Sequence, residues 1–197
     1  MQHMFIAAAA TAIFIGAGSG AVTSMTSAPQ TALMDVSNPM IAGAAMLPSE
    51  SILENASKSP EHATFVSQVK AARLAATLDG AGSYTAFAPT NAAYATRGKM
   101  DSTKAARDAR YLIVKGRYDS TTLLKLINEQ GGSVKLHTLE GGTITASLNG
   151  PTNIALMDEN GTTADIAIYD IQQKNGVMQV IDRVLTPSAH SRQVAIR

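Results

Sequence analysis

The apolar residues of this chain change their spacing once, near Gly132, and this change limits the fold more than any other feature of the sequence. Before it, residues 63–78 place Phe65 and Val69 on one helical stripe. After it, apolar residues alternate with polar ones from Val134, as in a half-buried strand. Asn-Gly pairs, which are typical of tight turns between antiparallel strands, separate the later apolar runs: Asn149-Gly150, Asn160-Gly161 and Asn175-Gly176. The sequence therefore predicts an α+β domain, with helices mainly in the first half and antiparallel strands in the second.

Helix starts in the first half are marked by short polar side chains that can accept a hydrogen bond from a free N–H of the first turn. Three pairs of candidates occur: Thr90 or Asn91, Asp101 or Ser102, and Asp119 or Ser120. The first pair follows a predicted strand over residues 84–88, which Pro89 ends because it lacks an N–H for the sheet ladder. The second pair is expected to start a helix that continues to about Val114, and residues 63–78 are expected to form one helix.

The N-terminal segment has the properties of a secretory signal peptide. Residues 4–17 are apolar and uncharged, and small residues follow through Ala21, although no Lys or Arg precedes the apolar run. Such a run is short for a membrane span and matches the apolar core of a signal peptide. We predict a signal peptide over residues 1–21, cleaved after Ala21, and hence a secreted, periplasmic or cell-surface protein. The alternative is an uncleaved membrane anchor, which would then be the protein's contact with a membrane.

The rest of the chain divides into three parts. Residues 22–47 contain two prolines and no steady hydrophobic period, so they are predicted to form a linker or a flexible N-terminal arm. Residues 48–187 carry the regular patterns and are predicted to form one domain. Residues 188–197 are predicted to be a C-terminal tail.

Two segments far apart in the chain indicate a family. Residues 85–94 read TAFAPTNAAY, and residues 175–187 read NGVMQVIDRVLTP. Together they resemble the two boxes of the fasciclin (FAS1) domain family, which read T-V-F-A-P-T-N-x-A-F and N-G-V-I-H-V-I-D-x-V-L-x-P. Residues 109–116, ARYLIVKG, are similar to the family's intervening segment, L-x-Y-H-V-V-x-G. The resemblance spans residues 48–187 and implies a secreted, bacterial, single-domain member.

The resemblance also implies how the domain is built. The family's fold is a wedge, or sandwich, of β-strands with helices packed along one side. Thr90 and Asn91 are then expected to satisfy backbone groups at the corner between a strand and a helix, and Asn175 and Gly176 to begin the closing strand. We interpret these four residues as structural.

The same resemblance points to interaction candidates, because a Tyr-His pair and an Asp-Ile pair have been linked to integrin-type adhesion in animal members. Here Tyr111 is followed by Leu112 instead of His, and the His of the second box is Gln179. The Asp-Ile pair is present as Asp170-Ile171. One interpretation makes Tyr111 a packed core residue and Asp170 a turn cap. In the other, Tyr111, Asp170 and Ile171 contribute to adhesion, with an exposed carboxylate beside an apolar side chain at a loop edge.

Composition excludes several classes of function. The chain has no cysteine, which excludes disulfides, zinc-thiolate sites and cysteine nucleophiles. Its net charge is +1, with 16% charged residues and no basic cluster interleaved with aromatics, so a nucleic acid partner is not expected. The histidines show no metal-ligand spacing on one face: His3, His62, His137 and His190. No cofactor or metal is predicted.

Two short motifs resemble catalytic or metal-binding patterns without their companion elements. Ser67 and Lys70 match the S-x-x-K of serine acyl-enzymes, but the S-D-N and K-T-G elements are missing. Residues 158–161, DENG, resemble part of a calcium loop, but their Gly stands fourth instead of sixth, so a hairpin turn is the better interpretation. The chain is therefore predicted not to be an enzyme.

These inferences lead to one predicted function and one alternative. The predicted function is that of an exported, non-enzymatic FAS1 domain acting as a cell-adhesion or interaction module at the cell surface or in the periplasm. The resemblance implies a protein, the matrix or a surface glycan as the partner. The alternative is a carrier of an apolar small molecule such as a carotenoid or lipid, because some secreted members of the family bind carotenoids.

Overall fold

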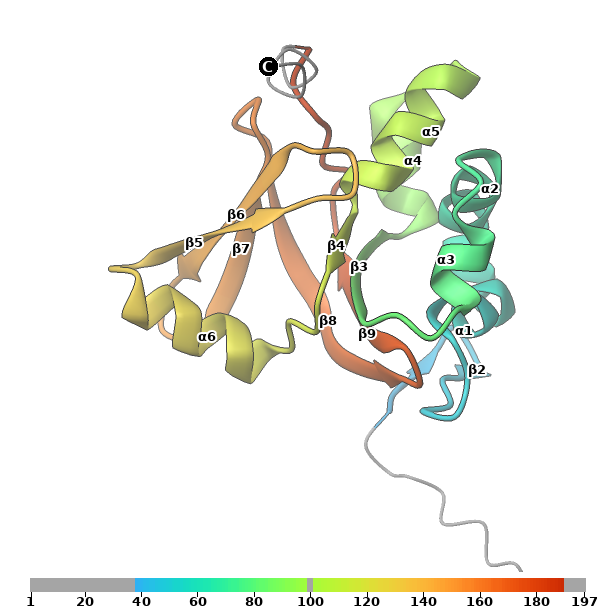
Figure 1. Ribbon diagram of the computed structural model, residues 1–197, viewed down its shortest axis with the longest axis horizontal. Helices are drawn as coiled ribbons and strands as arrows, with labels where there is room; N and C mark the ends of the chain where they lie inside the picture. Colours follow the sequence, from blue (N-terminus) through green and yellow to red (C-terminus); the bar gives the residue numbers. More distant parts are fainter. Residues whose placement is uncertain (1–37, 99–100, 190–197) are drawn as a thin grey trace, which may run out of the picture. The chain divides into compact units, whose positions relative to one another are not determined.

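The computed structural model describes residues 38–98 and 101–189, and its main feature is a 7-stranded sheet with the strand order β4-β3-β9-β8-β7-β6-β5 (Figure 1). The strands of this sheet are β3 (Tyr84–Pro89), β4 (Ile113–Lys115), β5 (Ser133–His137), β6 (Thr143–Asn149), β7 (Asn153–Met157), β8 (Thr163–Gln173) and β9 (Gly176–Ile181).

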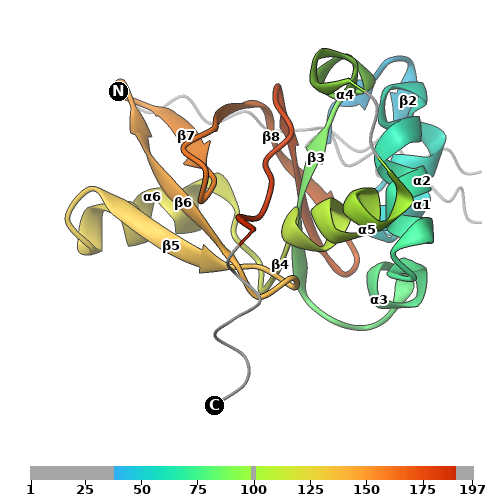
Figure 2. The same ribbon diagram turned by 90° about the horizontal axis from the view of Figure 1, so that it is seen from above.

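The helices of the first half gather beside the end of the sheet that holds β3 and β4 (Figures 1 and 2). They are α1 (Ile52–Lys58), α2 (Ala63–Ala71), α3 (Ala75–Asp79), α4 (Asn91–Arg97) and α5 (Ser102–Tyr111), with a 3-10 helix, η1, over Pro60–His62. A further helix, α6 (Ser120–Glu129), packs instead against β5 and β6. The predicted α+β class is confirmed, and α6 is the exception to helices packed along one side.

The predicted capping residues begin their helices as expected. The side chain of Thr90 accepts a hydrogen bond from the N–H of Ala93 at 3.2 Å. Asp101 and Asp119 cap α5 and α6 in the same way, at 2.8 Å each. These contacts satisfy donors that the first turn of a helix leaves free, and the sequence prediction of all three helix starts is confirmed.

The predicted helix over residues 63–78 is wrong in one respect, because it is broken into α2 and α3. Arg73 lies between them with φ at +59°, a left-handed conformation that ends α2. The N–H of Leu74 then donates to the carbonyl of Val69 at 3.0 Å. Leu74 is 8% exposed, so the break keeps the apolar residues on the buried side. Neither Gly nor Pro marks this break in the sequence.

The helix that was expected to reach about Val114 ends earlier, at Tyr111. Residues 113–115 instead form β4, which pairs antiparallel with β3 through Ala86 and Ile113. Ile113 and Val114 are β-branched, which favours a strand over a helix end. Tertiary pairing with β3 therefore decides this boundary.

The centre of the sheet joins the two segments that indicated the family. β3 and β9 pair in parallel, from Tyr84 opposite Gly176 to Pro89 opposite Ile181. Every residue of β9 is buried, as expected for a strand covered on both faces. The other neighbour of β9 is β8, which pairs with it antiparallel. The parallel pair was not predicted, because the sequence indicated antiparallel strands throughout the second half.

The Asn-Gly pairs all lie at hairpin connections, as predicted. They join β6 to β7, β7 to β8, and β8 to β9, and each of these strand pairs is antiparallel. Positive φ falls on the glycines, at +90° for Gly150, +83° for Gly161 and +151° for Gly176. Their asparagines keep negative φ, so in these turns Asn acts through its side chain.

The N-terminal boundary of the domain lies earlier than predicted. Residues 38–47 were expected in a linker or flexible arm, but they form a hairpin of β1 (Met40–Ile41) and β2 (Ala44–Ala45). Ile41 is 2% and Met46 3% exposed, so both belong to the core. The side chain of Asn38 also bonds to the backbone of Gln172, at 2.7 and 2.8 Å. This part of the linker prediction is wrong because the hairpin has apolar side chains to bury.

Three predicted segments lie wholly or partly outside the described residues. They are the signal peptide over residues 1–21, residues 22–37 of the predicted linker or arm, and residues 190–197 of the predicted tail. Of the remaining tail, Ser188 is held by the structure, because its N–H donates to Glu159 at 2.9 Å and its carbonyl accepts from Arg107 at 2.8 Å. Across 38–98 and 101–189, we find no helix with the length and apolar character needed to cross a membrane.

Candidate functional site

Asn91 holds the corner between β3 and α4 against the preceding helices. Its Oδ1 accepts from the N–H of Thr64 at 3.0 Å, at the start of α2. Its Nδ2 donates to the carbonyl of Pro60 at 2.7 Å. One amide thus satisfies two backbone groups that belong to η1 and α2, while the neighbouring Thr90 caps α4. This agrees with the structural interpretation of both residues.

Asn175 has the same kind of role at the start of β9. Its side chain is buried, and its Oδ1 accepts from the N–H of Ile52 at 3.0 Å, at the first residue of α1. Its Nδ2 donates to the carbonyls of Leu78 and Gly80, at 2.5 and 3.3 Å. One residue in the β8–β9 turn therefore joins the ends of two helices to the sheet.

Gly176 is required by the close approach of β3. A Cβ at this position would lie 1.8 Å from the carbonyl oxygen of Tyr84, which is far inside van der Waals contact. Its φ of +151° is also a conformation that side chains rarely adopt. Both observations agree with a structural role in the parallel pairing of β3 and β9.

Tyr111 is a core residue in this structure. Its side chain is fully buried, and its hydroxyl donates to the carbonyl of Thr143 at 2.5 Å. The hydroxyl also accepts from the N–H of Glu159 at 3.3 Å. Burial raises the pKa of this phenol, and the hydrogen bond from Glu159 opposes that increase. The structure therefore places Tyr111 beneath the surface and not on an exposed adhesion face.

Asp170 lies inside β8 and not at an exposed loop edge. The register of β8 against β9 shifts between Ile168 and Ile171, and Asp170 adopts φ of +58° at this irregularity. Its carboxylate accepts from the N–H of Ser120 at 2.7 Å and also from the Ser120 hydroxyl. Ser120 is the first residue of α6, so Asp170 adds a negative charge at the N-terminus of that helix.

Gln179 completes this arrangement, and sequence reasoning missed its role. Its side chain is fully buried in β9. Its Nε2 donates to the Asp170 carboxylate at 2.8 Å and to the carbonyl of Tyr118 at 3.2 Å, while its Oε1 accepts from the Asp170 N–H at 2.8 Å. The signal in the sequence was the replacement of the family's His by another side chain with both a donor and an acceptor.

The expected exposed pair at Asp170 and Ile171 is corrected by these contacts. Ile171 is 0% exposed, because it belongs to the core face of β8. The Asp170 carboxylate is half-buried and already holds α6 and β9. The two residues point to different environments, and together they do not offer a charge beside an apolar anchor. A binding role for Asp170 stays a prediction.

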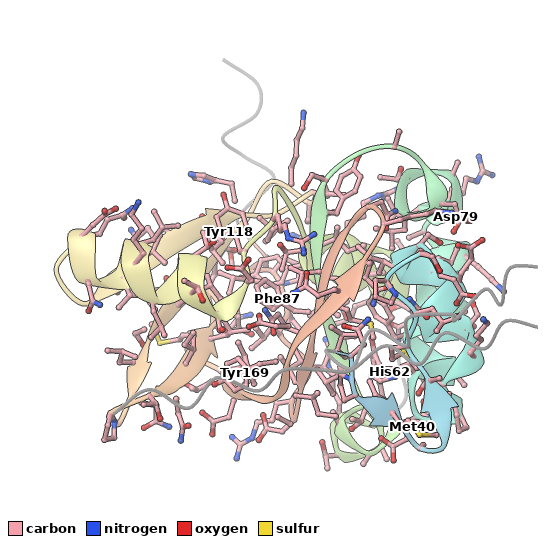
Figure 3. The ribbon with its side chains drawn as sticks, turned by 90° about the horizontal axis from the view of Figure 1, so that it is seen from below. Met40, His62, Asp79, Phe87, Tyr118 and Tyr169 are labelled. Atoms are coloured by element: carbon pink, nitrogen blue, oxygen red, sulfur yellow. The ribbon has the colours of Figure 1, made fainter. Side chains whose placement is uncertain are left out.

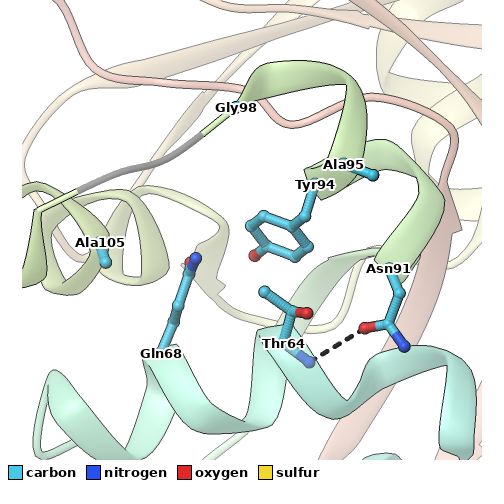
Figure 4. Close-up of a pocket in the computed structure, with 7 residues that line it drawn as sticks. All are labelled: Thr64, Gln68, Asn91, Tyr94, Ala95, Gly98 and Ala105. Atoms are coloured by element: carbon cyan, nitrogen blue, oxygen red, sulfur yellow. Dashed lines mark hydrogen bonds between the residues drawn. The ribbon is translucent and has the colours of Figure 1, made fainter.

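A cleft of about 410 Å³ opens between α2, α4 and α5 (Figure 4). Its walls include Thr64 and Gln68 from α2, Asn91, Tyr94 and Ala95 from α4, and Ala105 from α5.

Two polar atoms at this cleft have no hydrogen-bond partner among the described residues: Oε1 of Gln68 and the hydroxyl of Tyr94. The two residues are 7% and 6% exposed. A buried polar atom without a partner costs about 1–3 kcal/mol, so this arrangement works against stability.

A buried ion pair lies close to Tyr94. Arg97 of α4 and Asp108 of α5 approach to 2.5 Å, with the Asp108 side chain 2% exposed. Burial raises the pKa of Asp108, and Arg97 opposes that increase. Burial also raises the pKa of Tyr94, with a further contribution from the Asp108 carboxylate. Tyr94 is therefore a neutral phenol that can donate a hydrogen bond, and its surroundings carry paired charges.

The motifs that resembled catalytic or metal sites have other roles. Ser67 and Lys70 are both exposed on α2. Asp158 is buried, and it accepts from the N–H groups of Asn160 and Thr162 at 2.8 Å each, which confirms the hairpin turn. No group of three or more His, Asp or Glu side chains that could hold a metal ion occurs within residues 38–98 and 101–189.

His62 is a buried histidine without a metal-binding arrangement. It is 0% exposed and lies among the helices of the first half (Figure 3). Its Nδ1 is 2.9 Å from the Ser59 hydroxyl, and its Nε2 has no partner among the described residues. Burial lowers the pKa of this imidazole from 6.5 to about 4, so it is neutral near pH 7.

Comparisons with known proteins agree with this architecture. The family model of the fasciclin domain matches residues 60–187. Transforming growth factor-beta-induced protein ig-h3 of Sus scrofa is 30% identical over 128 residues, which are 65% of this chain and 18% of that protein. Protein sll1483 of Synechocystis is 29% identical over 142 residues, with 69% of this chain and 73% of that protein covered.

A solved structure shares the fold. It is a FAS1 domain pair from the insect cell adhesion molecule fasciclin I, with a TM-score of 0.57 and 18% identity. The match covers 69% of this chain and 50% of that one. The family model covers most of the described domain, including both Thr90-Asn91 and Asn175-Gly176. The chain therefore belongs to the fasciclin (FAS1) domain family.

Proposed function

We propose that this chain is an exported, non-enzymatic interaction module that adheres to a protein, matrix or glycan partner at the cell surface or in the periplasm. The observation that carries the proposal is the fold shared with the FAS1 pair of fasciclin I, which is itself described as a cell adhesion molecule. The carrier alternative stays a prediction.

The β1–β2 hairpin offers the apolar anchor that such a module needs. Met40 is 68% and Leu47 42% exposed, and Met40 lies at the periphery of the molecule (Figure 3). Residues 39–49 contain no charged side chain, so the exposed face of this hairpin is apolar. Exposed apolar groups surrounded by polar ones are typical of protein interaction sites. Lys58 and Glu50 supply a polar neighbour on the adjoining α1 side.

A binding assay on intact cells and on immobilised matrix proteins tests the proposal. We expect saturable binding of the purified protein, reduced at least about tenfold by Met40→Glu combined with Leu47→Glu, because a charge would have to be desolvated at the anchor. Met157→Glu is the matched control, since Met157 is 43% exposed but lies on β7. Absence of saturable binding to every surface tested would refute the proposed function.

Export is tested separately. We expect the exported protein to begin at Val22, because the preceding apolar run has the length of a signal peptide core. N-terminal sequencing of the protein recovered outside the cytoplasm decides this. A membrane-bound product that retains Met1 would contradict cleavage and support the anchor instead.

A further inference from the structure

We propose that Asn149 is a site of spontaneous covalent modification, at which the folded chain converts this amide to a carboxylate with water as the only co-reactant. Asparagine is among the chemically labile residues of proteins. The reaction uses two neighbouring residues, because the backbone nitrogen of Gly150 attacks the side-chain Cγ of Asn149. Glycine carries no side chain to hinder this attack. The modification is independent of the proposed interaction function.

The reaction has two steps. In the first, the Gly150 nitrogen forms a bond to the Cγ of Asn149 and the amide C–N bond breaks, which closes a five-membered succinimide. The proton that the Gly150 nitrogen loses passes through solvent to the amide nitrogen, which leaves as ammonia. In the second step, water adds to one of the two ring carbonyls and the bond from that carbon to the ring nitrogen breaks. Opening at Cγ gives aspartate, and opening at the main-chain carbonyl gives isoaspartate.

The reacting groups of this pair are accessible in the folded protein. Asn149 and Gly150 are exposed, in the turn between β6 and β7. The Asn149 amide donates to the exposed carboxylate of Asp165 at 3.2 Å, which solvent can replace. The Gly150 N–H has no hydrogen-bond partner among the described residues. A Cβ at Gly150 would have no atom within 4 Å apart from its chain neighbours, so space surrounds the attacking nitrogen.

The second Asn-Gly pair has the same residues, but its reacting groups are held. Asn160 is exposed, and its Nδ2 donates to the carbonyl and the hydroxyl of Thr186, at 2.9 and 3.0 Å. The N–H of Gly161, which would have to attack, donates to the carbonyl of Asp158 at 3.2 Å. Ring closure at this pair therefore requires that these hydrogen bonds break first.

The third pair is closed by burial. Asn175 is 4% exposed, and its amide contacts Ile52, Leu78 and Gly80. The amide would have to leave all three partners before its Cγ could turn toward the nitrogen of Gly176. Such a movement requires local unfolding of the β8–β9 turn and of the two helix ends that it holds.

Conversion of Asn149 changes the charge at the end of β6. The nitrogen that donates to Asp165 is replaced by an oxygen with negative charge, so attraction turns into repulsion. The N–H of Asp165 in turn donates to the exposed carboxylate of Asp182 at 2.8 Å, so a third carboxylate joins two on this surface. Isoaspartate also adds one carbon to the backbone, which disturbs the pairing of position 149 with Asn153.

The test incubates the purified full chain in mildly alkaline oxygen-18 water and follows each Asn-Gly pair by peptide mass spectrometry. The oxygen isotope separates conversion during incubation from conversion during digestion. In the folded protein, we expect Asn149 to convert at least about tenfold faster than Asn160 and Asn175, because its reacting groups need no local unfolding. The product should contain isoaspartate as well as aspartate. In concentrated urea, the three pairs should convert at similar rates, because each is then an exposed Asn-Gly pair.

Asn149→Gln is the matched control, because it keeps an amide whose longer side chain would have to close a six-membered ring. This variant should keep its charge at position 149 over the same incubation. Asn149→Asp isolates the effect of the charge: it should melt below Asn149→Gln, and added salt should reduce the difference.

The proposal is overturned if Asn160 or Asn175 converts as fast as Asn149 in the folded protein. It is also overturned if folding protects Asn149 as well, so that its conversion is seen in urea alone, or if no isoaspartate forms. The same order of rates in urea as in the folded protein would overturn it too, since the sequence and not the structure would then select Asn149.

Discussion

Replacing Asn175 by Ala should destabilise the domain far more than the same change at Asn149, although both asparagines precede a glycine in a hairpin turn. Asn175 is 4% exposed and contacts Ile52, Leu78 and Gly80 through its amide. Asn149 is exposed, and its amide makes a side-chain contact with Asp165 at 3.2 Å.

The magnitude follows from the groups that Asn175→Ala leaves behind. The N–H of Ile52 loses its acceptor at the start of α1, where the helix itself supplies none. The carbonyl of Leu78 loses the donor at 2.5 Å. Two buried groups without partners cost about 1–3 kcal/mol each, so we expect a loss of about 3–4 kcal/mol. This corresponds to a decrease in Tm of roughly 6–16 °C for a protein of this size.

Equilibrium unfolding in urea measures both variants, with the slope of the transition checked against the wild type. Asn149→Ala should lower the free energy of unfolding by less than about 1 kcal/mol, as for an exposed side chain. Asn175→Asp adds a separate test. The carboxylate keeps an acceptor for the N–H of Ile52, but it puts a second acceptor in place of the donor to the carbonyl of Leu78. This variant should therefore also be less stable than the wild type. The reasoning is refuted if Asn175→Ala lies within about 0.5 kcal/mol of the wild type or if Asn149→Ala is equally costly.

Three further outcomes are expected. Burial lowers the pKa of His62 from 6.5 in the unfolded chain to about 4 in the folded one, so protonation favours the unfolded chain. The free energy of unfolding should therefore be level above pH 6.5 and fall by about 3 kcal/mol toward pH 4. His62→Phe should remove this slope in unfolding curves taken across that range. Gly176→Ala should cost more than about 4 kcal/mol or prevent folding, because its Cβ would meet the carbonyl of Tyr84 at 1.8 Å; a wild-type unfolding midpoint would contradict this. Asp170→Ala should lower the free energy of unfolding in urea by about 2–4 kcal/mol, because the carboxylate accepts hydrogen bonds from Ser120. Unchanged stability with weakened partner binding would instead support a surface role for this residue.

Local chemistry made part of the fold predictable from the sequence. Thr90, Asp101 and Asp119 act through backbone N–H groups within three residues of themselves, so their caps could be read without any knowledge of the tertiary structure. The alternation of buried and exposed residues in β5 could be read in the same way. These features depend on neighbours in the chain.

Features of the fold that depend on contacts between residues far apart in the chain could not be predicted from the sequence. The break at Arg73 follows from burying Leu74, and β4 forms because Ile113 lies opposite Ala86. The candidate site shows the same limit, since the surroundings of Asp170 are set by Ser120 of another element. The unpartnered polar atoms of Tyr94 and Gln68 could not be predicted either, because their burial depends on the packing of α2 against α4.

The place of β9 in the sheet has a consequence for how the chain acquires its structure. β9 (Gly176–Ile181) is the last strand in the described part of the chain and lies between β3 and β8, so these two strands stay unconnected until β9 is synthesised, although Val114 and Thr138 bridge β4 to the segment after β5. Pairing β3 with β9 closes a long loop, which makes folding slow and leaves unpaired strand edges exposed in any incomplete chain. A protein truncated before Gly176 should therefore aggregate and not fold partially.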